Sequence, residues 1–500
     1  MDFLGPVIDG FGVVLEPMNL LYCFLGVVVG MLIGVLPGLG SAATIAILLP
    51  ITYGIDTISA IIMLAGIFYG AQYGGTITSV LLRLPGESSS VVTVLDGYEM
   101  TKQGRAGSAL GIAAIGSFIG GTVSIIGLTF FAPLVASFAL KFGPPEYAVL
   151  ALLGILLVAT LGGGNVLKSV IAASVGLLLA TVGVDLFTGL PRFTFGQLTL
   201  SDGIDFVPIA MGVFGLGEIL YNLERRSQGV SRKLKFTNAW PSKKDIKESS
   251  WAITRGSITG FVLGVLPGGG ATLSSMVSYA MEKKRAKDPS RFGKGAIEGV
   301  AGPETANNAA ATSSFIPLLS LGIPANATMA VIFGALLLHG ITPGPLLIID
   351  RPDLFWGVVN SMYIGNIILL ILSIPLVGVF VKILKVRPSL LAVTTVLITM
   401  LGVYTVQNSM FDILLVIIFG IIGYLMKKFS FEPAPLVLAF ILGGLLETSF
   451  RQSLRIFQGN ISGFIERPIS GLLLLAIFML LVVFPVAKTL WQRRKVKQRS

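Results

Sequence analysis

A seven-residue motif that occurs twice in this chain has the residue types of an anion-binding site inside a membrane. Gly34–Gly40 (GVLPGLG) recurs as Gly264–Gly270 (GVLPGGG), at an offset of 264 − 34 = 230 residues. Each copy lies in a long apolar stretch, where a proline and several glycines must interrupt a helix. The helix that restarts after such a break begins with free backbone N–H groups and about half a positive charge, which attract carboxylates and other anions.

The position of the two breaks indicates a substrate site. In a bilayer, broken backbone is tolerated only where it is buried in protein or lines a wet cavity, and two breaks at corresponding places in two halves are typical of a transporter's binding site. An amide pair is costly in an apolar helix, so a functional or packing partner is expected for Asn307 and Asn308. The predicted substrate-binding residues are Pro37, Gly38, Gly40, Ser41, Pro267, Gly268, Gly269, Gly270, Thr272, Asn307 and Asn308.

Hydroxyl side chains near the same breaks are suited to hold a hard monovalent cation beside the anion. The predicted cation ligands are Thr76, Thr78, Ser275 and Thr312. Glu304 has two interpretations that the residues leave open: it caps a helix near the membrane interface, or it serves the site.

A second pair of corresponding segments follows the breaks. Leu84-Pro85-Gly86-Glu87 in the first half matches Ile323-Pro324-Ala325-Asn326 in the second, at an offset of 324 − 85 = 239 residues. The nine-residue excess over the first offset is readily placed in the longer basic loop that follows the second break. The chain therefore carries an internal repeat.

The composition is that of a polytopic helical membrane protein. Of the 500 residues, 54% are hydrophobic and 12% are charged, whereas soluble domains carry about a quarter charged residues. The mean hydropathy is +0.86. Runs such as Ile469–Val486 and Val358–Val381 are long enough to cross the hydrocarbon core as helices.

Several function classes are disfavoured. One cysteine, Cys23, excludes an internal disulfide, and one histidine, His339, makes a multi-histidine metal or haem site implausible. The net charge of +11 comes from loops and the C-terminus, so it indicates cytoplasmic loops and no nucleic acid partner. Without a Walker motif, a Ser/His/Asp set or HExxH, we expect neither ATP hydrolysis nor an enzyme, and no cofactor beyond a coupling ion.

The charges that flank the breaks indicate an inverted arrangement. Basic segments 225–255 and Lys283–Lys294 lie on both sides of 256–281, which is therefore predicted to be a re-entrant hairpin that opens to the cytoplasm. The first break, within 19–53, is flanked by Glu16 and Asp56 with no cation nearby. We interpret it as the same hairpin entering from the other face, which is an inverted-topology repeat.

The predicted fold class is an all-α polytopic membrane protein with about 11–12 transmembrane helices and two re-entrant Pro-Gly-tipped hairpins. The predicted parts are a first repeat (1–224), a basic cytoplasmic linker (225–255), a second repeat (256–487) and a basic cytoplasmic tail (488–500). Besides the two runs named above, the predicted spans lie near 57–82, 107–134, 147–161, 169–184, 207–223, 296–321, 390–404, 413–426 and 435–446. Segment 323–349 is interrupted by prolines and glycines, and is either a second re-entrant element or an extracytoplasmic helix.

At these residues the chain closely resembles the large membrane subunit of tripartite tricarboxylate transporters, the TctA family. The resemblance covers roughly residues 15–465 and rests on a specific set of motifs. They are Gly34–Gly40 with Leu48–Gly54, Ala65–Gly70, Tyr73–Gly75, Pro85–Glu87, Asp96–Tyr98, Gln103–Gly107, Gly264–Ala271, Pro303–Glu304, Ala306–Ala309, Leu321–Pro324, His339–Gly340 and Pro343–Pro345.

The resemblance implies a secondary active transporter that takes up small carboxylates of the tricarboxylate or dicarboxylate class, driven by Na⁺ or H⁺. It also implies two partners, a periplasmic solute-binding protein (TctC-like) and a small membrane subunit (TctB-like), in the lipid bilayer of the bacterial inner membrane. An elevator-like movement would fit both the family and the inverted hairpins, with the C-terminus in the cytoplasm. The alternatives are a passive carboxylate channel and a non-transporting membrane scaffold subunit.

Overall fold

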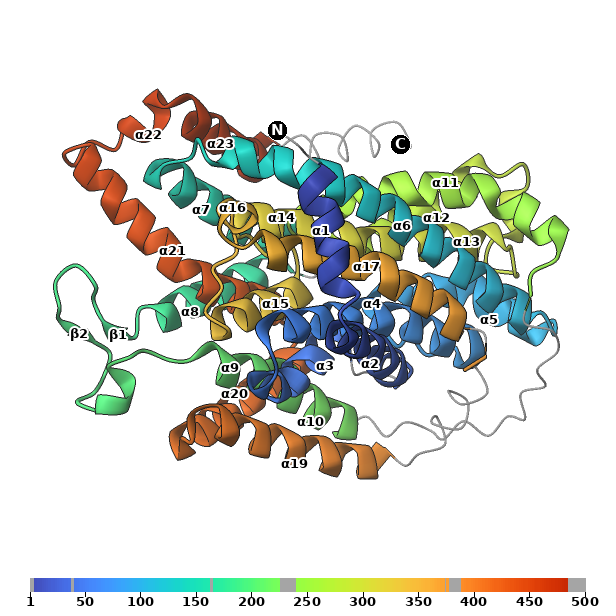
Figure 1. Ribbon diagram of the computed structural model, residues 1–500, viewed down its shortest axis with the longest axis horizontal. Helices are drawn as coiled ribbons and strands as arrows, with labels where there is room; N and C mark the ends of the chain where they lie inside the picture. Colours follow the sequence, from blue (N-terminus) through green and yellow to red (C-terminus); the bar gives the residue numbers. More distant parts are fainter. Residues whose placement is uncertain are drawn as a thin grey trace, which may run out of the picture.

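The computed structural model describes residues 4–36, 40–161, 165–224, 240–373, 375–376 and 388–483. The described chain is almost entirely helical (Figure 1). Seven of its helices are long and apolar enough to cross a membrane, and shorter apolar helices lie between them. The coarse prediction of an all-α membrane protein is confirmed; the number of spans and the hairpins stay predictions.

The elements of the first half run from α1 to α10. They are α1 (Leu4–Val14), α2 (Pro17–Gly34), α3 (Ser41–Leu48), η1 (Leu49–Gly54), α4 (Thr57–Leu82), η2 (Ser88–Ser90), α5 (Thr93–Lys102), α6 (Ala106–Ala139), α7 (Pro144–Leu161), α8 (Val166–Ala180), β1 (Gly183–Val184), β2 (Pro191–Arg192), η3 (Leu198–Leu200), α9 (Phe206–Ala210), η4 (Met211–Leu216) and α10 (Gly217–Glu224).

The elements of the second half run from α11 to η6. They are α11 (Lys243–Val265), α12 (Gly270–Arg285), η5 (Pro289–Arg291), α13 (Glu298–Ser313), α14 (Phe315–Leu321), α15 (Ala327–Leu338), α16 (Leu347–Asp350), α17 (Pro352–Ser373), α19 (Pro388–Gln407), α20 (Met410–Lys428), α21 (Ala434–Ile456), α22 (Gly463–Glu466), α23 (Pro468–Phe478) and η6 (Met479–Val483). In Figure 1, α11, α12 and α13 lie at one end of the molecule, and α7, α8 and α21 lie at the other.

Two helix pairs, one in each half, pack backbone to backbone. On α2 and α11, a Cβ added at any of six glycines would lie under 3.0 Å from a carbonyl oxygen of the partner helix, so only glycine fits. On α2 and α4 the glycine–carbonyl pairs are Gly26–Met63, Gly30–Ile67 and Gly34–Ala71, and on α11 and α13 they are Gly256–Gly302, Gly260–Ala306 and Gly264–Ala310. The glycines differ by 230 residues and the carbonyls by 239, which are the two offsets of the sequence motifs.

Several predicted boundaries differ from the structure. The span predicted at 169–184 is wrong at its end: α8 stops at Ala180, because Gly183 adopts φ 122° and starts a two-stranded ribbon with Pro191–Arg192. The span predicted at 296–321 consists of two helices, α13 and α14, that meet at Ser314. Segment 323–349 contains the helix α15 and the start of α16.

The predicted basic linker is helical in its second part. Helix α11 begins at Lys243 because the Ser242 hydroxyl and the Asp245 carboxylate cap each other's backbone N–H groups. Residues 225–239 of that linker, residues 377–381 of the predicted span 358–381, and the predicted tail 488–500 lie outside the described residues.

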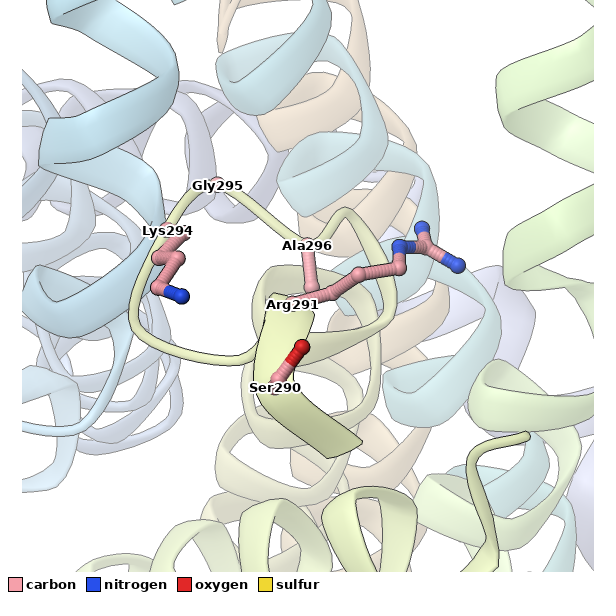
Figure 2. Close-up of a pocket in the computed structure, with 5 residues that line it drawn as sticks. All are labelled: Ser290, Arg291, Lys294, Gly295 and Ala296. Carbon is pink, nitrogen blue, oxygen red and sulfur yellow. The ribbon is translucent and has the colours of Figure 1, made fainter. Parts of the chain in front are cut away.

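A buried carboxylate ties the first half to the loop before α13. Oδ1 of Asp96 accepts hydrogen bonds from the backbone N–H groups of Gly293, Gly295 and Ala296 at 2.8–2.9 Å, and Oδ2 accepts one from the Tyr279 hydroxyl at 2.8 Å. The same loop borders an open hollow of about 190 Å³ (Figure 2). None of the predicted site residues lines this hollow. The loop therefore has a structural role: it connects α5 to α13 through Asp96.

Asp96→Asn is expected to destabilise the protein by about 2 kcal/mol, because an amide offers one acceptor oxygen where the carboxylate serves four donors, and hydrogen bonds to charged groups are the strong ones. Thermal unfolding of the purified protein in detergent measures this. Glu99→Gln on the same helix, where Glu99 pairs only with the exposed Lys102 nearby, is the matched control. Equal unfolding temperatures for the two variants would contradict the assignment.

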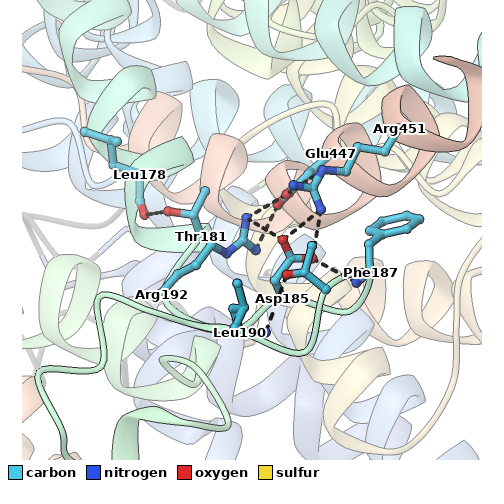
Figure 3. A network of polar contacts seen from close by, with 9 residues as sticks. Leu178, Thr181, Asp185, Phe187, Leu190, Arg192, Glu447 and Arg451 are labelled. Atoms are coloured by element: carbon cyan, nitrogen blue, oxygen red, sulfur yellow. Dashed lines mark hydrogen bonds and ion pairs between the residues drawn. The ribbon is translucent and has the colours of Figure 1, made fainter. Parts of the chain in front are cut away.

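A second polar network joins the β1–β2 ribbon to α21. Arg451 donates to Asp185 at 2.8 Å and Arg192 donates to Glu447 at 2.7 Å (Figure 3). The backbone N–H of Phe187 and the guanidinium of Arg451 hold the pKa of the Asp185 carboxyl well below its usual range. The network therefore stays charged at neutral pH and fixes the ribbon to α21.

Candidate functional site

The two breaks meet through crossed contacts between the halves. Ser41, which starts α3 after the first break, shares a hydrogen bond of 2.9 Å with Thr328 of α15. Thr272, which follows the second break, shares one of 3.0 Å with Ser88 of η2. Each break is thus completed by the segment that follows the Pro-containing loop of the other half, so Ser41 and Thr272, which follow the two breaks, both lie at contacts between the halves.

The first break holds a carboxylate of the protein itself. Gly40 is the N-cap residue of α3 and supplies no side-chain cap. Instead, the backbone N–H of Ser41 donates to Oε1 of Glu87, a side chain that is 8% exposed. A Cβ added at Gly40 would lie 3.4 Å from Oε2 of Glu87. The position predicted for a substrate anion is therefore occupied by Glu87; Pro37 and Gly38 lie outside the described residues.

The second break, before α12, depends on glycine backbone and lacks a side-chain carboxylate among the described residues. Gly268 adopts φ 78° and Gly270 φ 54°, values that favour glycine. The N–H of Gly268 donates to the carbonyl of Ala325 at 2.8 Å, so the tip after Pro267 is held by its own half. Gly269 is the N-cap residue of α12, and no side chain caps this helix.

The two tips are electrostatically unequal. By the offset of 239, Glu87 corresponds to Asn326, and Asn326 caps α15 by accepting from the N–H of Met329 at 3.0 Å. Asn326 therefore caps the neighbouring helix α15, whereas the carboxyl group of Glu87 lies at the start of α3. Of the two helix starts, α12 is the one without a side-chain carboxylate among the described residues.

The asparagine pair on α13 divides into two roles. Asn308 has a packing partner, because its amide donates to Ser117 of α6 at 2.7 Å and to the carbonyl of Glu304 at 3.1 Å. Asn307 is fully buried, yet neither of its amide atoms makes a hydrogen bond of ordinary geometry. Buried polar groups without partners are rare and need an explanation, so Asn307 is the better candidate for ligand contact.

The four predicted cation ligands differ in their hydrogen-bond partners. Thr76 donates to Glu304 at 2.5 Å, whereas Thr78 and Ser275 bond to carbonyls of their own helices, at Gly75 and Thr272. Thr312 is buried in α13. Within the described residues no hydrogen bond joins these four side chains, and Thr76 is the one of the four that donates to a carboxylate.

The sequence did not predict several residues that contact the candidate site. Ser88, Thr328 and Thr93 carry no signal as single residues, and they become visible only when the loops are placed. Glu87 belongs to the corresponding Pro-containing segments, so its offset from Asn326 is a signal that a repeat alignment reveals. Glu304, which was open between a cap and a site residue, is fully buried inside α13, away from the start of that helix.

Comparison with known proteins identifies the chain. The sequence pattern of the tripartite tricarboxylate transporter TctA family matches residues 20–438. The chain belongs to the TctA family. It is 50% identical over 497 residues (99% of this chain and 98% of the relative) to an uncharacterized 52.8 kDa protein in the TAR-I ttuC' 3' region of Agrobacterium vitis. It is also 51% identical over 215 residues (43% of this chain and 89% of the relative) to an uncharacterized protein in the TAR-II ttuC' 3' region of the same organism.

No solved structure matches this TctA-family chain. Membership in the TctA family, together with the apolar helices, makes the chain a multi-pass membrane subunit of a tripartite transporter rather than an enzyme. The prediction of the family from the residues alone is confirmed.

Proposed function

We propose that this protein is the cation-coupled uptake permease for small carboxylates of the tricarboxylate or dicarboxylate class. The observation that carries the proposal is the meeting of the two interrupted helices through the crossed pairs Ser41–Thr328 and Ser88–Thr272. An anion at that centre faces the start of α12, which carries no side-chain carboxylate among the described residues, rather than lysines or arginines, which are costly at membrane depth. Carboxylates suit such starts because backbone N–H groups bind them directly.

We further propose an inverted-topology repeat with an elevator-like movement of the site-bearing segments. The proposal is supported by the recurrence of the glycine–carbonyl contacts at offsets of 230 and 239 residues. It is also supported by the way each break pairs with the segment after the Pro-containing loop of the opposite half. Such a repeat can present one site to either side of a membrane by exchanging the roles of its halves.

The proposed setting is the bacterial inner membrane with the C-terminus in the cytoplasm. The proposed partners are a TctC-like periplasmic solute-binding protein, which delivers the carboxylate, and a TctB-like small membrane subunit. The coupling ion is Na⁺ or H⁺.

Uptake into proteoliposomes that contain the permease, the small subunit and the binding protein tests the proposal. Saturable uptake that collapses when the Na⁺ and proton gradients are dissipated supports a secondary permease. Flux that is independent of both gradients indicates the passive channel, and lack of flux with an intact, bound complex indicates the non-transporting scaffold. Either result overturns the proposal.

The inverted arrangement predicts that the flanks of the two breaks label from opposite sides of the membrane. Single cysteines at Gly54 and Lys284 suit the test, because both positions are exposed and a Cβ at Gly54 would meet no atom within 4 Å. The native Cys23 is buried and serves as the unlabelled background. An impermeant maleimide applied to oriented vesicles should reach one position only; labelling of both from the same side would refute the inverted repeat.

A further inference from the structure

Glu304 is a buried carboxylate without a cationic partner. It is fully buried in α13 and receives hydrogen bonds from two hydroxyls, Thr76 of α4 at 2.5 Å and Thr93 of α5. No lysine, arginine or histidine of the described chain pairs with it. Removing an ionised carboxylate from water is unfavourable unless a positive charge compensates it, so this group needs a cation or a proton.

Asn307 supplies a second, independent observation. It lies three residues after Glu304 on the same helix, which puts the two side chains on one face. It is fully buried, and within the described residues neither atom of its amide makes a hydrogen bond of ordinary geometry. An amide oxygen that accepts no hydrogen bond beside a buried carboxylate is a suitable ligand for a cation, and the amide lies close enough to Glu304 to interact with that carboxylate.

The chemistry of the group selects the kind of ion. The two carboxylate oxygens, the two threonine hydroxyls and the Asn307 amide oxygen are five hard oxygens from three helices. One carboxylate balances one positive charge. In the part of the chain that the structure describes, no further acidic or histidine side chains gather into a cluster for a divalent or transition metal. A single carboxylate with neutral hydroxyl and amide oxygens therefore suits a hard monovalent ion such as sodium.

We propose that Glu304, Thr76, Thr93 and Asn307 form a sodium site. Sodium neutralises Glu304, and the Asn307 amide oxygen completes its coordination. The site lies next to the breaks, because Gly75, the neighbour of Thr76, packs against Glu87. The proposal that sodium binds here depends only on these four residues. The proposal that sodium is the coupling ion also depends on the proposed function.

The test is sodium binding by the purified full chain in detergent. Thermal unfolding is followed while NaCl replaces choline chloride at constant ionic strength and constant pH. The wild type should show a saturable upward shift of the unfolding temperature that Glu304→Gln abolishes. Thr93→Val, which keeps the carboxylate, should weaken the apparent sodium affinity about tenfold or more. Ser117→Ala, which removes a hydroxyl bonded to Asn308 in the same region, is the matched control and should keep the wild-type response.

Three outcomes overturn the sodium site. The first is a wild type without a sodium-specific shift, and the second is a sodium shift that survives in both Glu304→Gln and Thr93→Val. The third comes from a parallel pH titration without sodium: stabilisation by acidification alone that Glu304→Gln abolishes assigns a proton instead. Uptake separates this inference from the proposed function. Sodium binding that depends on Glu304 in a protein without uptake refutes the permease alone, and sodium-driven uptake by Glu304→Gln refutes the site alone.

Discussion

Gly260→Ala is expected to lower the yield of folded protein sharply and to cost more than about 3 kcal/mol of stability. A Cβ at this position would lie 2.7 Å from the Cβ of Ala309 and still closer to the carbonyl oxygen of Ala306. Overpacking a well-packed contact costs about 1–3 kcal/mol and occasionally more. Here the obstacle is helix backbone, which cannot rotate away, so α11 must separate from α13. The measurement is the thermal unfolding of the purified protein in detergent.

The same substitution elsewhere gives matched controls. Gly30→Ala places a methyl group against the carbonyl of Ile67 in the first half and should be as damaging as Gly260→Ala. Gly12→Ala on α1 meets no atom within 4 Å and should be neutral or stabilising by up to about 1 kcal/mol, because alanine favours a helix. A wild-type unfolding temperature for Gly260→Ala would show that the two helices of this pair are free to separate.

Glu87→Gln is expected to lower the KM for carboxylate uptake by about three- to tenfold. The Glu87 carboxylate accepts from the N–H of Ser41 and so occupies the positive start of α3. Such a contact is worth about 0.3–2 kcal/mol, and 1.4 kcal/mol corresponds to a factor of ten in binding. Glutamine keeps the size of the side chain but cannot ionise, so an anionic cargo no longer competes with a negative charge. The effect should appear above pH 7 and fade below it, because burial raises the pKa of the Glu87 carboxyl to about 7.

Concentration-dependent uptake in proteoliposomes measures this effect. Glu99→Gln, which removes a carboxylate of α5 that pairs with Lys102, is the control and should leave KM unchanged. A KM that rises in Glu87→Gln would mean that the carboxylate assists the cargo or its cation, contrary to the competition that we infer.

The sequence predicts those parts of the structure that depend on local interactions. The two breaks, the two offsets and the glycine-rich helices are readable because proline and glycine act on the backbone where they stand. The occupation of the α3 start by Glu87 is not readable, because it depends on a loop that lies 46 residues away in the chain. The ribbon after α8 was mistaken for helix because its apolar residues continue the run, and only the left-handed region at Gly183 ends it.

The asparagine pair illustrates the same limit at single-residue resolution. Asn307 and Asn308 are adjacent and chemically identical, and their cost in an apolar helix predicts that each needs a partner. Because successive residues on a helix point about 100° apart, one amide donates to Ser117, and the other makes no hydrogen bond of ordinary geometry within the described residues. The rotational position of each residue on the helix decides which asparagine packs against Ser117. The sequence predicts helix boundaries only to within a few residues, so it cannot make this assignment.

The crossed pairs Ser41–Thr328 and Ser88–Thr272 also constrain biosynthesis. A nascent chain that has emerged only as far as α10 possesses the first break but neither Thr328 nor Thr272, so its α3 start lacks the hydroxyl contact that closes it. The binding centre therefore matures late, after the ribosome has supplied α15. Until then, the half-made chain lacks the contacts that complete the proposed site.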